Sequence, residues 1–178
     1  MGNNYKIVFT GPVGAGKTTA IRSISDVEPI TTDESASDMT RSMKPTTTVA
    51  MDYGLMRLEA NDRVHLYGTP GQERFDFMWE ILIEGSLGLV LLLDNTSKSP
   101  YQDMKFFTSA FRNFIEERRM VVGVTRMDEA GHPSIDHYQG WLEELSLSAP
   151  VFEVDARRKR DVMALITALL FSMDPGAA

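Results

Sequence analysis

Residues 11–18 read Gly-Pro-Val-Gly-Ala-Gly-Lys-Thr, and their types and spacing are those of a phosphate-binding loop. Glycines allow the tight backbone curvature that turns successive N–H groups toward one anion. In such a loop Lys17 reaches the outer phosphates and the Thr18 hydroxyl binds Mg²⁺. A glycine-rich turn with a solvent-facing lysine is the alternative. The phosphate ligands that we expect are Gly14, Ala15, Gly16, Lys17, Thr18 and Thr19.

Three residues further along the chain can add to a site of this kind. Asp128 follows an apolar run, and its carboxylate can accept two hydrogen bonds from N1 and N2 of guanine, which adenine cannot supply. A turn aspartate is the alternative there. Gly71 can bring a backbone N–H close to a terminal phosphate, where a side chain would obstruct it. Asp52 shares one strand face with Thr48 and can hold a metal-bound water, although an aspartate near a strand end is often only solvated.

Strands and helices alternate along the chain and would position these residues. We expect strands at 5–10, 48–58, 63–68, 87–94, 120–125 and 151–154, and helices at 17–25, up to about 85, 100–117, 134–145 and 160–173. The run 87–93 is apolar throughout, which suits a strand buried on both faces. The alternation predicts an α/β fold of three layers, with a mostly parallel six-stranded sheet, about five helices, and ligands at the carboxyl ends of the strands.

Composition limits the class of protein. The 178 residues are 43% hydrophobic, enough for one domain with a full-sized core. A net charge of −7 argues against a general binder of nucleic acid or anionic membrane. The absence of cysteine excludes disulfides and prenyl or palmitoyl attachment, and Lys6 stands where an N-myristoylation signal has Ser or Thr. No apolar run is long enough to span a bilayer. These features predict a single cytoplasmic domain over 1–178.

Five segments, in this order, resemble the nucleotide-binding motifs of Ras-superfamily small GTPases. They are 11–18, Thr-Val-Ala-Met-Asp-Tyr at 48–53, Thr-Pro-Gly-Gln-Glu-Arg-Phe at 69–75, Thr-Arg-Met-Asp at 125–128 and Asp-Ala-Arg at 155–157. The chain looks most like the bacterial branch that includes the gliding-motility GTPases, whose second switch also reads Pro-Gly-Gln without the usual preceding Asp. The resemblance implies a P-loop NTPase fold of the Ras-like G-domain type, which binds GTP or GDP with Mg²⁺. It also implies a first switch region at 26–48 and a second at 68–85.

The resemblance assigns roles to single residues. Gln72 would orient the attacking water, and together with Lys17 and Thr48 it forms the catalytic set that we expect. A solvated turn glutamine is the alternative. Thr48 would bind Mg²⁺ and sense the terminal phosphate, whereas a threonine that merely favours a strand is the other interpretation. The base ligands implied are Thr125 and Arg126 in the usual Asn and Lys positions, Asp128, the N–H of Ala156, and Arg157 in place of the usual Lys.

Two positions depart from the Ras pattern. Gly68 stands where the family has the aspartate that supports the metal, and Asp52 is the candidate substitute. Val13 stands where most Ras relatives have a glycine close to the terminal phosphate. A branched side chain there can crowd Gln72 and any arginine finger, so we expect slow intrinsic hydrolysis.

The resemblance predicts a GTP-binding switch that a partner protein reads. Residues 75–83 are more apolar than one helix face can bury, so Phe75, Phe77 and Trp79 are candidate contacts for an effector or a GTPase-activating or exchange protein. Core packing is the alternative for this stretch. Two other functions stay open: a guanine-nucleotide-binding module that hardly hydrolyses, and a P-loop ATPase or small-molecule kinase.

Overall fold

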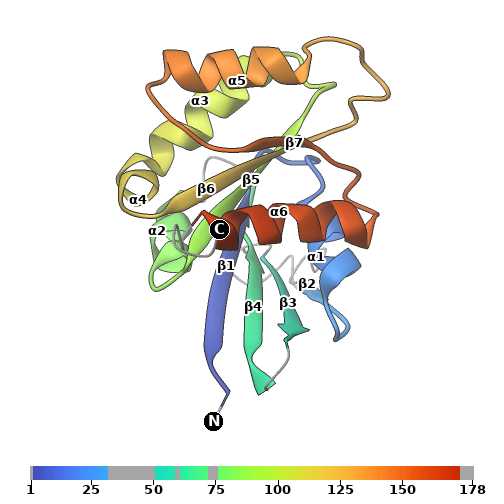
Figure 1. Cartoon of the computed structure of the whole chain (residues 1–178), viewed down its shortest axis with the longest axis vertical. Coiled ribbons are helices and arrows are strands. Elements are labelled where there is room, and N and C mark those ends of the chain that lie inside the picture. Colours follow the sequence, from blue (N-terminus) through green and yellow to red (C-terminus); the bar gives the residue numbers. More distant parts are fainter. Residues whose placement is uncertain (1, 32–50, 59–60, 72–75, 173–178) are drawn as a thin grey trace, which may run out of the picture.

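The computed structural model describes residues 2–31, 51–58, 61–71 and 76–172. Within these ranges one seven-stranded sheet is covered by helices on both faces (Figure 1). The strands are β1 (Asn4–Thr10), β2 (Ile30–Thr31), β3 (Asp52–Arg57), β4 (Arg63–Gly68), β5 (Gly88–Asp94), β6 (Arg119–Thr125) and β7 (Val151–Glu153). The helices are α1 (Lys17–Ile24), α2 (Phe77–Ile83), α3 (Pro100–Ala110), α4 (Arg112–Glu117), α5 (Ile135–Glu144) and α6 (Lys159–Phe171).

The sheet has the strand order β2-β3-β4-β1-β5-β6-β7. The pairs β1–β4, β1–β5, β5–β6 and β6–β7 are parallel, whereas β3 runs antiparallel to both β2 and β4. This arrangement confirms the predicted three-layer, mostly parallel α/β fold. The described residues hold one strand more than expected, because Ile30 and Thr31 pair with the start of β3. They also hold one helix more, because the predicted helix 100–117 is divided at Phe111 into α3 and α4.

Two apolar layers hold the sheet between its helices. On one face, side chains of β1 and β5 such as Phe9 and Leu92 pack against α1 and α6. On the other face, the alternate residues, such as Val8 and Leu91, pack against α2, α3 and α5. Strand β5 is buried on both faces, as its unbroken apolar run predicts. Fully burying each large aliphatic side chain stabilises the fold by about 1.5–3 kcal/mol.

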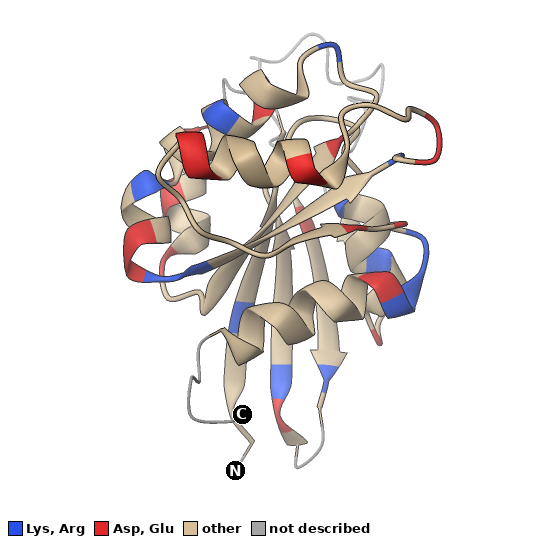
Figure 2. Ribbon diagram, turned by 45° about the horizontal axis from the view of Figure 1, so that its top comes forward, with Lys and Arg blue, Asp and Glu red and all other residues tan. Residues whose placement is uncertain are grey.

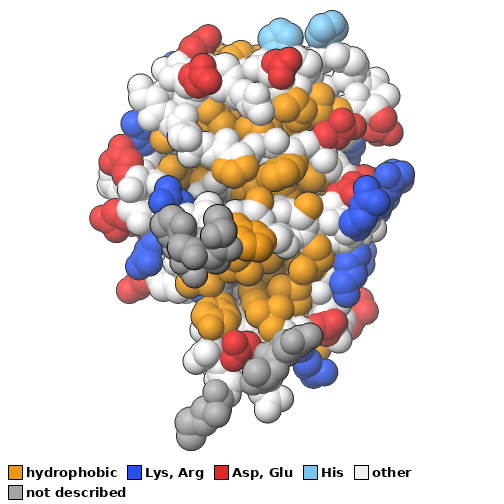
Figure 3. Space-filling view, in the orientation of Figure 1, with side chains coloured by type: hydrophobic (Ala, Val, Ile, Leu, Met, Phe, Trp, Pro, Cys, Tyr) orange, Lys and Arg blue, Asp and Glu red, His pale blue; other side chains and the backbone are white. Residues whose placement is uncertain are grey.

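The surface reflects this layering. On the face that carries α6, apolar side chains gather over the centre and charged ones lie around them (Figure 3). Basic side chains stand at the start of α6, whereas acidic ones dominate the outer side of α5 (Figure 2). No described helix combines the length and apolarity that crossing a bilayer requires.

The fold brings the candidate functional segments to one edge of the sheet. Because β1, β4, β5 and β6 are parallel, their carboxyl ends lie together at this edge. The loop after β1 leads directly into α1, so the N-terminus of that helix faces the same edge. The antiparallel strand β3 begins there, with Asp52.

Candidate nucleotide site

The loop between β1 and α1 has the backbone conformation that an anion cradle needs. Gly14 and Gly16 have positive φ angles of 82° and 103°, which residues with side chains rarely adopt. The loop is closed by a hydrogen bond from the Ala15 N–H to the Pro12 carbonyl at 3.2 Å. Gly16 then caps α1, so the free N–H groups of the first helical turn follow the loop without interruption.

Lys17 is buried and its ammonium group is held over the loop. The Nζ atom donates to the carbonyls of Gly11 at 2.7 Å and Pro12 at 2.8 Å. Burial lowers the pKa of Lys17 to about 8, and the nearby carboxylate of Asp52 opposes part of this shift. A lysine aimed this way can bind an anion that enters the cradle, and that anion would stabilise its charged form.

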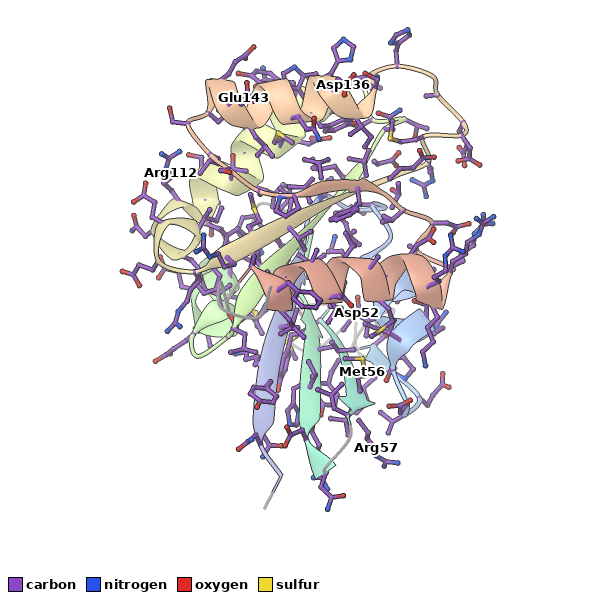
Figure 4. All side chains as sticks on the ribbon, in the orientation of Figure 1. Asp52, Met56, Arg57, Arg112, Asp136 and Glu143 are labelled. Atoms are coloured by element: carbon purple, nitrogen blue, oxygen red, sulfur yellow. The ribbon has the colours of Figure 1, made fainter. Side chains whose placement is uncertain are left out.

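Asp52 fills the space left by a glycine on the neighbouring strand. It pairs with Gly68 in the antiparallel β3–β4 register, and the Thr18 hydroxyl donates to its Oδ2 at 2.6 Å. A Cβ atom built on Gly68 would lie 3.1 Å from both the Cβ and the Oδ2 of Asp52. Asp52 is buried, with 8% of its surface exposed, and lies beside α1, where Figure 4 labels it. An aspartate at the end of β4 would thus compete with Asp52 for one location.

The carboxylate and hydroxyl suit a magnesium ion bound mainly through phosphate. The described residues contain no cluster of three or more His, Asp or Glu side chains that could hold a metal by themselves. A hydroxyl oxygen that binds Mg²⁺ keeps its hydrogen for a nearby carboxylate, and Thr18 and Asp52 already have that relation. The residues present therefore fit an ion that phosphate oxygens help to hold.

The segment after β4 lies directly on the phosphate loop. A Cβ atom on Gly71 would lie 2.6 Å from the Val13 nitrogen and 2.9 Å from Lys17 Nζ, so only glycine fits. The segment is fixed before this glycine by the buried hydroxyl pair of Thr10 and Thr69, 2.9 Å apart. Val13 itself is 67% exposed.

A cleft of about 550 Å³ adjoins the phosphate loop. All the residues expected to bind a base line it: Thr125, Arg126, Asp128, Ala156 and Arg157, together with Ala15 and Gly16 of the loop. The exposed Asp128 carboxylate takes part in none of the hydrogen bonds or ion pairs of the described residues. Among the described residues, none accepts a hydrogen bond from the Ala156 N–H. The cleft thus offers a free acceptor and a free donor beside the cradle.

Two of the expected base ligands, Thr125 and Arg126, form hydrogen bonds with the phosphate loop. The buried Thr125 hydroxyl lies 3.1 Å from the Ala15 carbonyl and ties β6 to the phosphate loop. The Arg126 guanidinium donates to the Gly14 carbonyl at 3.0 Å and forms an ion pair with Asp94. Thr125 therefore positions the loop, while the stem of Arg126 lies along the cleft.

Arg157 is held at the rim of the cleft by its neighbour. Its Nε and one terminal nitrogen donate to the two carboxylate oxygens of Asp155, each at 2.9 Å. These hydrogen bonds hold the pKa of Asp155 near 2. The Arg157 side chain is otherwise mostly exposed, so it can cover a base only from the outer side.

The structure corrects the prediction for Trp79, and several other predicted residues lie outside the described ranges. Trp79 is wrong as a partner contact, because it is 2% exposed and stacks on Phe111 with ring centres 5.3 Å apart. Its Nε1 donates to the Pro70 carbonyl, which a buried indole requires. Phe77 and Ile81 are the exposed apolar residues of α2, at 61% and 66%. The remaining expected residues Thr48, Gln72 and Phe75 lie outside the described residues.

Three residues that support the cleft were not predicted from the sequence. Asp94, Asn95 and Tyr138 hold the segment that carries Asp128. Asp94 and Asn95 do carry a weak signal, because they are polar residues directly after the carboxyl end of an apolar strand. Tyr138 lies on an ordinary amphipathic helix and carries none.

A phosphate cradle at the start of α1 and a base-sized cleft at the carboxyl ends of parallel strands define a nucleotide-binding P-loop domain of the GTPase-like type. The family model described as "conserved hypothetical ATP binding protein" matches residues 24–171. This range covers most of the chain, and the chain belongs to that family. The match begins after the phosphate loop, within the last turn of α1.

Three individual relatives match between about two thirds and nine tenths of the chain. The chain is 25% identical over 122 residues to an uncharacterized protein of Methanocaldococcus jannaschii, covering 68% of each. It is 20% identical to the Ras-related protein RabC of Dictyostelium discoideum over 93% of this chain and 82% of RabC. It is 21% identical to the Ras-related protein SEC4 of Candida albicans over 69% of this chain, but spans only 60% of SEC4.

A solved structure supports the same fold. The bacterial selenocysteine-specific elongation factor EF-Sec superposes with a TM-score of 0.70 at 21% identity. The match covers 98% of this chain and 30% of the elongation factor. The likeness identifies the fold of one part of that larger protein.

Proposed function

We propose that this domain binds guanine nucleotides and acts as a switch that hydrolyses GTP slowly to GDP. The observation that carries the proposal is the pairing of Asp128 with Ala156 in one cleft beside the phosphate loop. Guanine presents N1–H and N2–H donors to a carboxylate and its O6 acceptor to an N–H. Adenine would turn its unprotonated N1 toward the carboxylate, leaving two acceptors opposed.

The phosphates would bind along the N–H groups of Gly14 through Thr19, with Lys17 at the outer phosphates. Mg²⁺ would be held by Thr18, with Asp52 fixing the direction of the Thr18 hydroxyl and Thr48 as a further ligand. The bound ion would neutralise phosphate charge. Asp52 would orient the Thr18 hydroxyl. Because the hydroxyl hydrogen points to Asp52 Oδ2, 2.6 Å from the hydroxyl oxygen, the lone pairs of that oxygen point away from β3.

The switch role rests on Gly71, Thr48 and Gln72. The close packing of Gly71 on the phosphate loop supports a backbone N–H that responds to a terminal phosphate. Gln72 would orient the attacking water, and the bulk of Val13 would keep intrinsic turnover low. GTP would then order the segments 26–48 and 68–85, and hydrolysis would release them.

We further propose that the chain is closest in mechanism to the bacterial gliding-motility branch of small GTPases, with an effector and regulators that contact the switch regions in the cytoplasm. The Gly68 and Pro70-Gly71 pattern supports this placement. The exposed Phe77 on α2 supports a partner contact next to the second switch. Trp79 has no part in it.

The decisive variant is Asp128→Asn. An amide there offers a donor where the carboxylate accepted, so it fits xanthine, whose C2 carries oxygen in place of an amino group. We expect GDP affinity to fall and XDP affinity to rise, measured by displacement of a fluorescent nucleotide. Asp136→Asn on the outer side of α5, labelled in Figure 4, is the matched control and should leave both affinities unchanged. Unchanged GDP binding in Asp128→Asn would remove Asp128 from the site.

ATP is the second candidate ligand, because the description of the matched family names ATP binding. The same displacement experiment with ADP in place of GDP distinguishes an adenine-nucleotide site from a guanine-nucleotide site. A domain that binds guanine nucleotide without hydrolysing it is distinguished by single-turnover phosphate release, which would stay at the uncatalysed level.

A further inference from the structure

The segment that carries Asp128 is clamped at both ends by one residue. Asn95 follows β5, and its backbone N–H donates to the Thr125 carbonyl at 3.0 Å, just before segment 126–130. Its side-chain Nδ2 donates to the Ala130 carbonyl at 2.7 Å, at the end of that segment. A single residue therefore fixes where the five-residue segment begins and ends.

The orientation of the Asn95 amide is set by Tyr138 of α5. The tyrosine hydroxyl donates to Asn95 Oδ1 at 2.7 Å. The Ala130 carbonyl can only accept, so the amide must present its NH₂ group to Ala130 and its oxygen to the tyrosine. Donors and acceptors are therefore uniquely assigned along the series from Tyr138 through Asn95 to Ala130.

Burial makes this chain of hydrogen bonds consequential. Tyr138 is fully buried and Asn95 is 2% exposed. Every buried side-chain nitrogen and oxygen among the described residues has a hydrogen-bond partner. Removing the Tyr138 hydroxyl would leave Asn95 Oδ1 unsatisfied, and the amide would then be free to rotate.

Asp128 depends on this support because no hydrogen bond holds its own side chain. Its carboxylate makes no hydrogen bond or ion pair with a described residue and interacts electrostatically with the exposed Arg157, so its place in the cleft follows mainly from the backbone of segment 126–130. The other hydrogen bond within the segment runs from the Glu129 N–H to the Arg126 carbonyl. The exposed Arg126 side chain also contacts the Gly14 carbonyl and the carboxylates of Asp94 and Glu129. The buried clamp is the firmest of these.

We propose, building on the guanine-nucleotide function above, that Asn95 and Tyr138 are positioning residues that determine base selectivity by holding Asp128 at the guanine edge. Neither residue lines the cleft, so the clamp acts on the base indirectly, through the backbone of segment 126–130. Loss of the clamp reduces the preference for guanine over bases that donate fewer hydrogen bonds to the Asp128 carboxylate.

The test compares GDP with inosine diphosphate, which lacks the 2-amino group and so offers Asp128 one donor in place of two. Dissociation constants are measured by displacement of a fluorescent GDP derivative. Tyr138→Phe keeps the ring, which packs against Trp141 at 4.9 Å, and removes only the hydroxyl. We expect GDP to bind about threefold to tenfold more weakly, with a smaller loss for inosine diphosphate, so that the ratio of the inosine diphosphate dissociation constant to the GDP dissociation constant falls.

The matched control is Tyr101→Phe, which deletes another tyrosine hydroxyl beside the same Trp141, with ring centres 5.4 Å apart. It should leave both constants and their ratio unchanged. In an Asp128→Ala background, Tyr138→Phe should have no further effect on GDP, because the group that it positions is gone. Asn95→Ser is measured in the same way and keeps the test open if Tyr138→Phe does not fold.

The outcomes separate the clamp from the function on which it builds. If Asp128→Ala weakens GDP binding but Tyr138→Phe and Asn95→Ser leave the GDP to inosine diphosphate ratio unchanged, the clamp is refuted. An equal loss for GDP and inosine diphosphate also refutes it, because that is the result of general loosening. If Asp128→Ala leaves GDP affinity unchanged, the guanine-binding function itself fails, and the clamp with it.

Discussion

Removal of the Asp52 carboxylate should weaken the effect of Mg²⁺ on nucleotide binding. The carboxylate accepts a hydrogen bond from Thr18 at 2.6 Å in a buried setting. Hydrogen bonds to charged groups contribute about 1.5–3 kcal/mol, which corresponds to about tenfold to 100-fold in affinity. Groups that orient a metal ligand have effects of the same size on metal affinity, about 10–100-fold.

The assay is the dissociation rate of fluorescent GDP in Mg²⁺ and in excess EDTA. In Asp52→Ala we expect the slowing by Mg²⁺ to shrink by about 10–100-fold, while the rate in EDTA stays near that of the parent. Asp52→Asn keeps an acceptor of the same shape and should give a smaller loss. An equal response to Mg²⁺ in Asp52→Ala and the parent would refute this role.

An exchange variant tests the location of the carboxylate. Because a Cβ on Gly68 would lie 3.1 Å from the Cβ and Oδ2 of Asp52, Asp52→Gly combined with Gly68→Asp puts a carboxylate back into the same space from the opposite strand. It should recover part of the Mg²⁺ effect. Gly68→Asp alone should destabilise the fold, because two carboxylates then compete for one place beside Ile21.

Three further predictions follow from the phosphate loop and the core. Burial lowers the pKa of Lys17 to about 8. The nucleotide-free protein therefore loses the Lys17 proton as the pH rises past 8, whereas Lys17 beside a bound phosphate keeps it. Nucleotide affinity should accordingly fall above pH 8 by up to about tenfold per pH unit. Lys17→Arg stays charged and should give a flat profile between pH 7 and 9, and a flat profile in the parent would contradict this. Intrinsic GTP hydrolysis should be slower than about 1 per second and faster in Val13→Gly, as single-turnover phosphate release would reveal; a slower variant would remove Val13 as the obstacle. Trp79→Ala should lower the free energy of unfolding by about 3–5 kcal/mol, whereas Ile81→Ala at the exposed face should change it by no more than about 0.5 kcal/mol, both by urea titration.

Local patterns were sufficient to predict most of the fold. The unbroken apolar run of β5 and the alternation of strands with helices predicted a covered parallel sheet, and the structure confirms it. The two-residue strand β2 escaped prediction, because Ile30 and Thr31 lie in a polar segment and pair only through contact with β3. The break between α3 and α4 at Phe111 has no glycine or proline to mark it.

The candidate site was predictable where a motif encodes backbone shape, and not where distant side chains meet. The loop 11–18 and the cleft around Asp128 come together as expected, because strand ends at one edge of a parallel sheet converge. Trp79 was misjudged, because α2 is a short helix that is apolar nearly all round. Which of its faces is buried depends on α3, and the sequence of α2 does not specify it. The Asn95–Tyr138 pair is separated by 43 residues and leaves no local pattern.

The most direct test of guanine recognition is a competition between GDP and ADP for the nucleotide site of the unmodified protein. Fluorescent GDP is bound in the presence of Mg²⁺ and displaced with each unlabelled nucleotide in turn. Because the carboxylate of Asp128 matches the donors of guanine and opposes N1 of adenine, GDP should displace the probe at a concentration at least about 100-fold lower than ADP. Equal displacement by the two nucleotides, or stronger displacement by ADP, would contradict guanine recognition by Asp128 and Ala156.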